Sequence, residues 1–461
     1  MTDQPLSVIV IGAGISGLCA AYWLKKRGFT VTVLEKENSV GGTMKTIHDN
    51  GWLVETGPNS ALETTPLFRE LFDELGIASE RIYAGELAQN RYIVKNGMLL
   101  PLPMGPGAFI RTKLFSTSGK IRLLKEPFIG RPAKNESIAE FVERRLGAEF
   151  LDYAVNPFVA GVYAGDPRSL SVRCALPKLF ALEEKYGGLV RGMIGSRRER
   201  KARQEVAKDR AKLFSFRKGM HEFPKSIAAS LGASVQTGAR VESMIPMRSG
   251  RYPVYTVSYT QGSERRSVQS DAVILAAPAA AAAEIIRPID PEMARALNAI
   301  EYPPVAEVFT GFRRDQIRHR LDGFGFLVPE RERRNVLGTI WSSSLFPDRA
   351  PAGHVALASF VGGARQPELV QLGDRDLRER VLGDLRDLLG LSGEPVYERI
   401  TRWTRAIPQY TLGYEGVLGA IDRFEQNFQG AFICANYRGG ISVGDCVMSA
   451  ERIVRRIAGR G

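Results

Sequence analysis

Residues 6–17 read LSVIVIGAGISG, and this stretch decides the fold of the chain. The apolar run 6–11 predicts a short buried strand, and the spacing of Gly12, Gly14 and Gly17 predicts a tight turn. Apolar residues then recur at helical spacing, which predicts a helix. A strand, a glycine turn and a helix in this order are typical of a nucleotide-binding α/β sheet.

A second strand is expected at Val31–Leu34, and Glu35 follows it 18 residues after Gly17. A carboxylate at this strand end can accept hydrogen bonds from a ribose, while the glycines let the backbone approach a pyrophosphate at the helix amino terminus. We therefore expect a bound dinucleotide, and the acid disfavours the ribose phosphate of NADP. The alternative is a glycine-rich turn without a ligand.

Two further glycine motifs favour FAD over NAD. Residues 41–46 read GGTMKT and residues 55–60 read ETGPNS. The pair resembles the GG-doublet flavoproteins, a class that contains amine oxidases, phytoene desaturases and protoporphyrinogen oxidases. That class often has arginine after the doublet, where this chain has Thr43.

The resemblance implies non-covalent FAD, although Cys434 and Cys446 flank the last glycine turn. The expected cofactor contacts are Gly12, Gly14, Ile15, Ser16, Gly17, Glu35, Lys36, Gly41, Gly42, Thr43, Gly57, Pro58, Asn59, Ser60, Val241, Trp403, Ile441, Ser442 and Val443.

The FAD-binding domain is expected to be split into residues 1–90, 226–286 and 401–461. Residues 91–225 are expected to form a helical, basic insertion, and 287–400 a substrate-binding domain with a mixed or antiparallel sheet. The fold class is thus α/β, with a split Rossmann-like domain, a substrate domain and a helical insertion that associates with a membrane. The patterns predict strands at 233–241, 271–278, 306–312, 336–341, 355–360 and 430–437, and helices at 374–389 and 446–458. A capping box, Ser137 with Glu140, predicts a helix start, and Gly147 its stop.

The net charge of +13 is concentrated in the insertion. Residues 91–225 hold 27 Lys and Arg residues against 13 Asp and Glu residues. Such a block indicates an anionic partner: nucleic acid, lipid or an acidic small molecule. The four cysteines form no CxxC pair and the four histidines are scattered, so no metal site is expected. Residues 4–24 are uncharged, but glycines interrupt them and no spanning helix or signal peptide is expected.

Several longer stretches are similar to the protoporphyrinogen IX oxidase family, from the first strand to the last helix. They are NRYIVKNG at 90–97, NPFVAGVYAGDPRSLS at 156–171, GFGFLVP at 323–329, WTRAIPQY at 403–410 and NYRGG at 436–440. The stretch at 156–171 is far more specific than the glycine motif.

This resemblance implies an oxygen-dependent enzyme of haem biosynthesis that oxidises protoporphyrinogen IX in three two-electron steps. Each step passes a hydride to FAD, and oxygen then reoxidises the flavin and is reduced to hydrogen peroxide. Arg91 matches the position that anchors a propionate, and Gly161 the glycine beside the macrocycle. Phe324, Phe326 and Leu327 are expected to supply apolar walls. We find no Ser/His/Asp set and no general base. The flavin is therefore expected to carry the chemistry, and no side chain is expected to be catalytic.

Residues 98–110 are uncharged, and after them Arg111, Lys113, Lys120, Arg122 and Lys125 alternate with apolar side chains. Cations among apolar residues suit an anionic bilayer surface, so we expect a cytoplasmic protein held peripherally on the cytoplasmic membrane. No nucleic-acid module accompanies the charge, and nucleic acid is not expected as a partner. The polar stretch 196–212 is interpreted as a solvated helix or loop. An oligomer remains possible.

Three alternatives stay open. The same scaffold could oxidise coproporphyrinogen III to coproporphyrin III. It could act as an amine or carotenoid oxidoreductase, or it could be a membrane-binding scaffold without catalytic activity.

Overall fold

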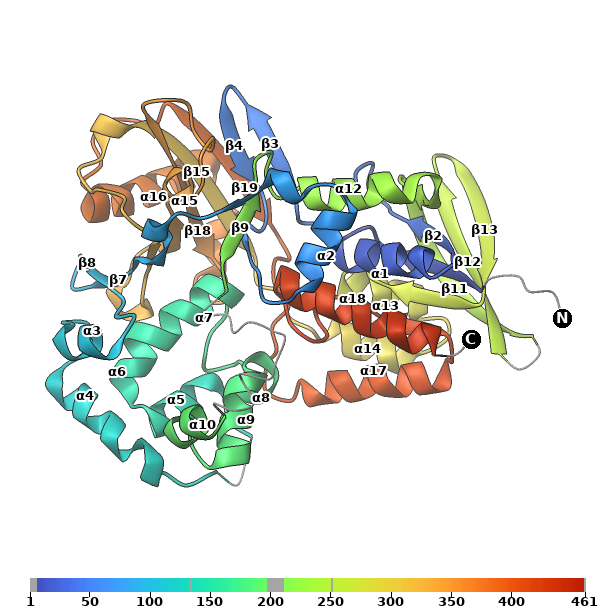
Figure 1. Cartoon of the computed structure of the whole chain (residues 1–461), viewed down its shortest axis with the longest axis horizontal. Helices are drawn as coiled ribbons and strands as arrows, with labels where there is room; N and C mark the ends of the chain where they lie inside the picture. The colour runs from blue at the N-terminus through green and yellow to red at the C-terminus, as the bar shows by residue number, and fades with distance from the viewer. Residues whose placement is uncertain (1–5, 133–134, 197–210, 250–251, 460–461) are drawn as a thin grey trace.

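The computed structural model describes residues 6–132, 135–196, 211–249 and 252–459. Its first sheet is wholly parallel and is built from distant parts of the chain, which lie side by side in Figure 1. The strand order is β10 (Val235–Gln236), β2 (Thr30–Leu34), β1 (Ser7–Ile11), β14 (Ala272–Leu275) and β20 (Ala431–Ile433). All five strands lie in the three segments predicted to form the split domain, so the α/β fold class is confirmed.

Both faces of this sheet are covered, because its strands are apolar on both sides. One face packs under α1 (Ile15–Lys26), α2 (Leu67–Glu74), α12 (Glu222–Leu231) and α18 (Val443–Ala458). The other face packs against α13 (Ala279–Ile286), α14 (Pro291–Asn298), α17 (Glu415–Asn427) and the antiparallel sheet β11 (Ala239–Ser249), β12 (Tyr252–Gln261) and β13 (Glu264–Ser270).

A second, seven-stranded sheet is the centre of the other part of the fold. Its order is β19 (Tyr397–Trp403), β15 (Val305–Arg313), β18 (His354–Gly362), β17 (Val336–Ile340), β16 (Gly325–Leu327), β7 (Arg91–Lys95) and β8 (Met98–Pro101). Only β16 and β7 pair in parallel, and α16 (Asp374–Leu389) covers one face. The predicted strands and the helix at 374–389 are therefore present.

Two parts of the predicted helical insertion belong elsewhere. Strands β7 and β8 extend the seven-stranded sheet, because Arg91–Ile93 pair with Gly325–Leu327. Residues 213–231 form β9 (Leu213–Phe216), which pairs with β5 (Ala61–Leu62) and β6 (Arg81–Tyr83), and then α12, which packs on α1. The hairpin β3 (Thr46–Asp49) and β4 (Trp52–Glu55) lies between the two sheets.

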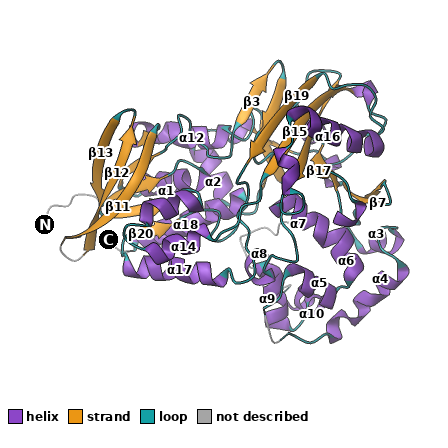
Figure 2. Ribbon diagram, turned by 180° about the vertical axis from the view of Figure 1, so that it is seen from behind, coloured by secondary structure: helices purple, strands orange, loops and turns teal. Residues whose placement is uncertain are grey.

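The rest of the insertion is helical and forms a separate lobe (Figure 2). The predicted capping box of Ser137 and Glu140 opens α5, and Gly147 ends that turn with φ 97°. Buried ion pairs join Arg145 to Glu126 and Glu183 inside the lobe. Most of 196–212 lies outside the described residues, and within the described part no helix has the length and apolar run of a bilayer crossing. The helices are α3 (Pro106–Arg111), α4 (Thr117–Arg122), η3 (Leu123–Phe128), α5 (Ile138–Arg145), α6 (Ala148–Phe150), η4 (Leu151–Val155), α7 (Asn156–Tyr163), α8 (Val172–Ala175), α9 (Pro177–Tyr186) and α10 (Leu189–Gly195).

Candidate active site

One cavity of about 3800 Å³ connects the two sheets. At one end it is lined by the glycine turn after β1, and at the other by α7 and β16. Every residue predicted to contact cofactor or substrate lines this cavity, apart from Gly17. The sequence motifs, far apart in the chain, thus converge on one site.

The glycine turn leaves room for a ligand at the start of α1. A Cβ on Gly17 would lie 2.1 Å from the carbonyl oxygen of Gly12, so this glycine is needed for the packing of the turn itself. A Cβ on Gly14 would meet nothing within 4 Å, and Gly14 caps α1 without a side-chain hydrogen bond. The first amides of α1 therefore face open space, where an anion is favoured by the helix dipole.

Glu35 lies at the end of β2 and is buried. Its Oε2 accepts a hydrogen bond from the Ala13 amide at 2.7 Å, and its Oε1 accepts one from the Glu37 amide at 2.9 Å. The carboxylate is thus fixed against the glycine turn, and its remaining lone pairs can accept hydrogen bonds from a ribose. Lys36 forms an ion pair with Glu37 at 3.4 Å.

The GG doublet is tied to the first turn. The Gly41 amide donates to the Ala13 carbonyl at 2.8 Å, and Gly41 forms a bridge with Gly14. A Cβ on Gly57 would lie 1.9 Å from the Thr43 carbonyl oxygen, so the two flavoprotein motifs are in direct contact. Trp403 donates from Nε1 to the Thr56 carbonyl at 2.7 Å and closes this part of the wall.

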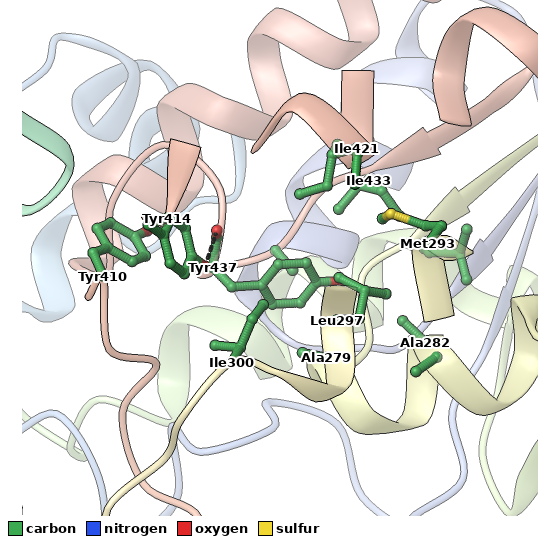
Figure 3. Close-up of a cluster of buried hydrophobic side chains, with 14 of the residues drawn as sticks. Ala279, Ala282, Met293, Leu297, Ile300, Tyr410, Tyr414, Ile421, Ile433 and Tyr437 are labelled. Atoms are coloured by element: carbon green, nitrogen blue, oxygen red, sulfur yellow. Dashed lines mark hydrogen bonds between the residues drawn. The ribbon is translucent and has the colours of Figure 1, made fainter. Parts of the chain in front are cut away.

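The carboxy-terminal turn is held in place by buried tyrosines (Figure 3). Tyr410 donates to the Asn436 carbonyl at 2.7 Å and accepts from the Gly440 amide at 3.1 Å, and Tyr414 donates to the Tyr437 carbonyl at 2.8 Å. Burial raises the pKa of both phenols. Both phenols are therefore neutral and stabilise the turn through these hydrogen bonds.

After this turn, α18 begins with a second capping box, in which Ser442 accepts from the Asp445 amide at 3.2 Å. Ile441 and Val443 line the cavity beside it. Val241 reaches the cavity from β11, on the side of Glu35.

The chamber at the other end of the cavity is shaped by contact between α7 and β16. A Cβ on Gly161 would lie 2.4 Å from Cδ2 of Leu327, so only glycine allows this approach without displacing the leucine. Both residues line the cavity, and Ile93 lies beside Leu327 in the adjacent strand. The chamber wall is apolar here.

Arg91 stands at the start of β7, with its guanidinium 5.3 Å from the ring centroid of Phe324. Desolvation lowers its pKa, and the described residues offer it no carboxylate within ion-pair distance. An arginine without an acidic partner, held over an aromatic ring at a cavity wall, can bind an anionic group of a ligand.

Phe326 differs from its neighbours. It is 2% exposed and packs in the core under α16, because successive side chains of a strand alternate between faces. Leu327 faces the chamber, whereas the Phe326 ring belongs to the opposite face of the sheet. Phe326 thus belongs to the lining of the cavity, but its ring contributes to the core and not to the apolar wall at Leu327.

Sequence reasoning passed over Glu307, which lies in β15, lines the cavity and is 3% exposed. The pattern at 306–312 indicates only a buried strand. The available signal was a single acid within an otherwise apolar strand, since a buried carboxyl without a partner is costly. Only the tertiary structure shows that it faces a cavity.

Comparisons with known proteins cover nearly the whole chain. The model of the family described as flavin containing amine oxidoreductase matches residues 15–458. Protoporphyrinogen oxidase 2, chloroplastic/mitochondrial, of Arabidopsis thaliana is 34% identical over 96% of this chain and 92% of the relative. Coproporphyrinogen III oxidase of Bacillus subtilis (strain 168) is 28% identical over 98% of each chain.

The fold is also found among solved structures. One from Exiguobacterium sp. 255-15 matches with a TM-score of 0.80 at 22% identity, over 99% of this chain and 100% of that chain. Reduced UDP-galactopyranose mutase matches with a TM-score of 0.75 at 16% identity, over 99% of this chain and 95% of that chain.

Proposed function

This chain belongs to the flavin containing amine oxidoreductase family, and from this premise we propose that it is an FAD-dependent oxidase that converts protoporphyrinogen IX to protoporphyrin IX. The observation that carries the proposal is the cavity that joins the glycine turn before α1 to an apolar chamber with Arg91 in its wall.

The residues present fit FAD. The open space at Gly14, the uncapped amides of α1 and the fixed carboxylate of Glu35 provide for a pyrophosphate and a ribose. The walls at Thr43, Gly57–Ser60, Trp403 and Ile441–Val443 are proposed to hold the ring system. The chemistry that FAD supplies when bound is hydride acceptance, repeated three times per substrate, with transfer of the electrons to oxygen to give hydrogen peroxide.

The protein's own residues orient the substrate. We propose that Arg91 binds a propionate, because its guanidinium presents several donors and lacks an acidic partner among the described residues. Gly161 and Leu327 form the wall against the macrocycle, and Phe324 supports the Arg91 side chain. Apolar walls exclude water while they fix the distance between the reacting carbon and the cofactor.

The decisive experiment supplies protoporphyrinogen IX and coproporphyrinogen III separately to the purified holoenzyme under air. Porphyrin fluorescence is followed above the spontaneous rate, and hydrogen peroxide is measured in parallel. We expect faster turnover of protoporphyrinogen IX and one peroxide for each two-electron step. Equal or faster turnover of coproporphyrinogen III would reverse the choice of substrate.

Coproporphyrinogen III is the second candidate, and one observation favours it. Arg173, Lys178 and Lys185 also line the cavity, on the side of α8 and α9. A substrate with four propionates offers more carboxylates to such cations than protoporphyrinogen IX, which has two. The relative from Bacillus subtilis, which is 28% identical to this chain, is named coproporphyrinogen III oxidase and supports this second candidate.

We also propose that the helical lobe rests on an anionic membrane surface. Large apolar side chains protrude from α3, α4 and η3, with exposed fractions of 72% at Ile110, 73% at Leu124 and 84% at Phe128. Arg111, Lys113 and Lys125 are exposed on the same segment. Apolar side chains that enter the interface beside cations that meet lipid headgroups make a peripheral anchor.

Vesicle flotation tests the membrane proposal. The holoenzyme should float with vesicles containing anionic lipid at low salt and be released as the salt rises, whereas Leu124→Ser combined with Phe128→Ser should abolish flotation without loss of bound flavin. A protein that never floats with anionic vesicles would refute the proposal.

A further inference from the structure

Glu307 is a buried acid at the cavity wall. It is 3% exposed, lines the cavity, and its Oε1 finds no hydrogen-bond partner among the described residues. A buried carboxyl that only stabilised the fold would have both oxygens bonded, as Glu55 has with Thr46 and Met220. Leaving such a group unpaired costs stability, so its retention in the cavity wall suggests a role toward what the cavity holds.

The strand register shows where Glu307 points. In β15, Val305 and Phe309 share its face: Val305 packs against α7 and Phe309 against Trp52 of β4. The same face carries one continuous row across the sheet, from β7 to β19. The row consists of Ile93, Leu327, Gly338, Phe360, Glu307 and Thr401.

Glu307 therefore lies between the proposed cofactor and substrate contacts. Trp403, which donates a hydrogen bond to the Thr56 carbonyl within the second flavoprotein motif, pairs with Val305 in the adjacent row of the sheet. Leu327, the partner of Gly161, lies three strands away from Glu307. Arg91 is on β7, four strands away, which corresponds to about 19 Å between strand axes.

The surroundings of Glu307 favour its uncharged form. Burial raises the pKa of this carboxyl well above its usual range, and the neighbouring Glu55 carboxyl raises it further. Burial also raises the pKa of Glu55, to about 7, against the hydrogen bonds from Thr46 and Met220 and the nearby Arg349. Among the described residues of the elements packed on this face, Glu55 is the titratable group that acts on Glu307.

We propose that Glu307 is the catalytic base of the site, which takes a pyrrole N–H proton from the porphyrinogen as hydride leaves the adjacent meso carbon. This inference rests on the proposed function. A porphyrinogen presents N–H donors at its centre, and an unpaired carboxylate oxygen in an apolar wall is an acceptor for them.

The step balances in atoms and electrons. The meso C–H bond breaks and its electron pair leaves with the hydrogen, so the substrate is oxidised by two electrons and the cofactor is reduced. The N–H bond breaks, its electron pair stays in the substrate and completes the new conjugated double bond, and an O–H bond forms on Glu307. The proton then passes to water, which restores the carboxylate.

The test measures flavin reduction by anaerobic porphyrinogen in stopped flow, across a range of pH, in the holoenzyme. In the wild type the rate should rise with pH, because the active carboxylate form of Glu307 appears only as the pH approaches its raised pKa. Glu307→Gln should lower the rate by roughly 10²-fold and remove the rise. Glu307→Asp should retain a rise at a lower rate.

Asp384→Asn is the matched control, because Asp384 is a buried acid on α16, on the other side of the sheet. It should keep the wild-type rate and pH profile. Reduction of each variant by dithionite should be equally fast, since this reductant needs no base. A Glu307→Gln variant with the wild-type rate and pH profile would overturn the inference.

A second measurement does not depend on turnover. The visible absorption of the resting flavin should change with pH in the wild-type holoenzyme, since a charge forms beside the cofactor, and Glu307→Gln should abolish this change. Persistence of the wild-type titration in Glu307→Gln would also overturn the inference. Absence of turnover with either porphyrinogen in the wild type would instead refute the proposed function, and the spectral titration would still report on Glu307.

Discussion

At the scale of single residues, the shape of the chamber depends on a glycine, which has no side chain. Gly161 lies against Leu327 so closely that a Cβ would approach Cδ2 to 2.4 Å. Gly161 is within α7, where alanine would be the better helix former. The close approach explains why glycine stands here in spite of its poor helix propensity.

Gly161→Val should destabilise the protein by about 1–3 kcal/mol, because the added methyl groups overpack the contact with Leu327. Combining it with Leu327→Ala should cost less than the sum of the two single changes. Urea unfolding of the four proteins measures this coupling. Gly383→Val is the control: Gly383 lies in α16, where an added Cβ would meet nothing within 4 Å, so it reports helix propensity alone. Strict additivity would contradict the contact.

Arg91→Ala should raise the KM for the porphyrinogen by roughly 10–100-fold, since one hydrogen bond to a charged group contributes about 1.5–3 kcal/mol. Bound flavin, measured from its absorption, should remain at the wild-type level, and Arg91→Lys should recover part of the affinity. Arg423→Ala removes an exposed cation outside the cavity and should behave as the wild type. Unchanged kinetics in Arg91→Ala would remove Arg91 from the site.

At the scale of elements, the two glycines at the start of α1 have different roles: one is required by the packing of the fold, and the other leaves space for a ligand. Gly17 is required by contact with Gly12 inside the turn, whereas Gly14 has an extended backbone and free space around it. The protein alone would accept alanine at Gly14. A bound pyrophosphate would not, because it needs the same space.

Gly14→Ala should therefore lower FAD affinity at least tenfold while the apoprotein keeps its fold. Gly373→Ala is a closely matched control, since Gly373 also caps a helix in extended conformation with nothing within 4 Å. Both changes carry the same loss at the helix cap, so their apoprotein melting temperatures should shift alike. FAD titration by fluorescence quenching should show the loss only for Gly14→Ala, and equal affinities would contradict a pyrophosphate at this turn.

At the scale of the whole molecule, one cavity is lined by both sheets, which are built from interleaved parts of the chain. Residues of β1, β11, β15, β16, β19 and the loop before α18 all line it. A ligand in this cavity contacts both sheets at once, so it binds the assembled fold and not the unfolded chain.

Removal of FAD should lower the melting temperature, and added FAD should restore it in proportion to the logarithm of its concentration. Free ligand at about 100 times its Kd contributes about 2.7 kcal/mol to a site that exists only in the folded state. Differential scanning calorimetry of the holo- and apoprotein measures the shift. NADP, whose ribose phosphate would meet Glu35, serves as the control and should not restore the melting temperature.

Local patterns were sufficient for the first half of the nucleotide-binding unit. The strand at 6–11, the glycine turn and the helix after it were predicted correctly, and Glu35 follows β2 as expected, because hydrogen bonding along the backbone and the size of glycine determine these features over a few residues. The capping box of Ser137 and the helix at 374–389 follow for the same reason.

Pairings between distant strands were not predictable in this way. The alternation of β7 is visible in the sequence, but its pairing with β16, more than 200 residues later, is not. For this reason the helical insertion was predicted to begin at residue 91. The faces of Phe326 and Glu307 depend on the same pairings. Alternation shows that neighbouring side chains point in opposite directions, but not which direction holds the core and which the cavity.

The sequence by itself thus determined the cofactor class, the α/β fold and the motifs that line the cavity, since these rest on short-range backbone geometry. The tertiary structure alone decided that the motifs share one cavity. It also decided that, among the described residues, Arg91 has no acidic partner and Oε1 of Glu307 has no hydrogen-bond partner. The physical reason is that burial and hydrogen-bond satisfaction are properties of the packed whole, which side chains from distant segments create together.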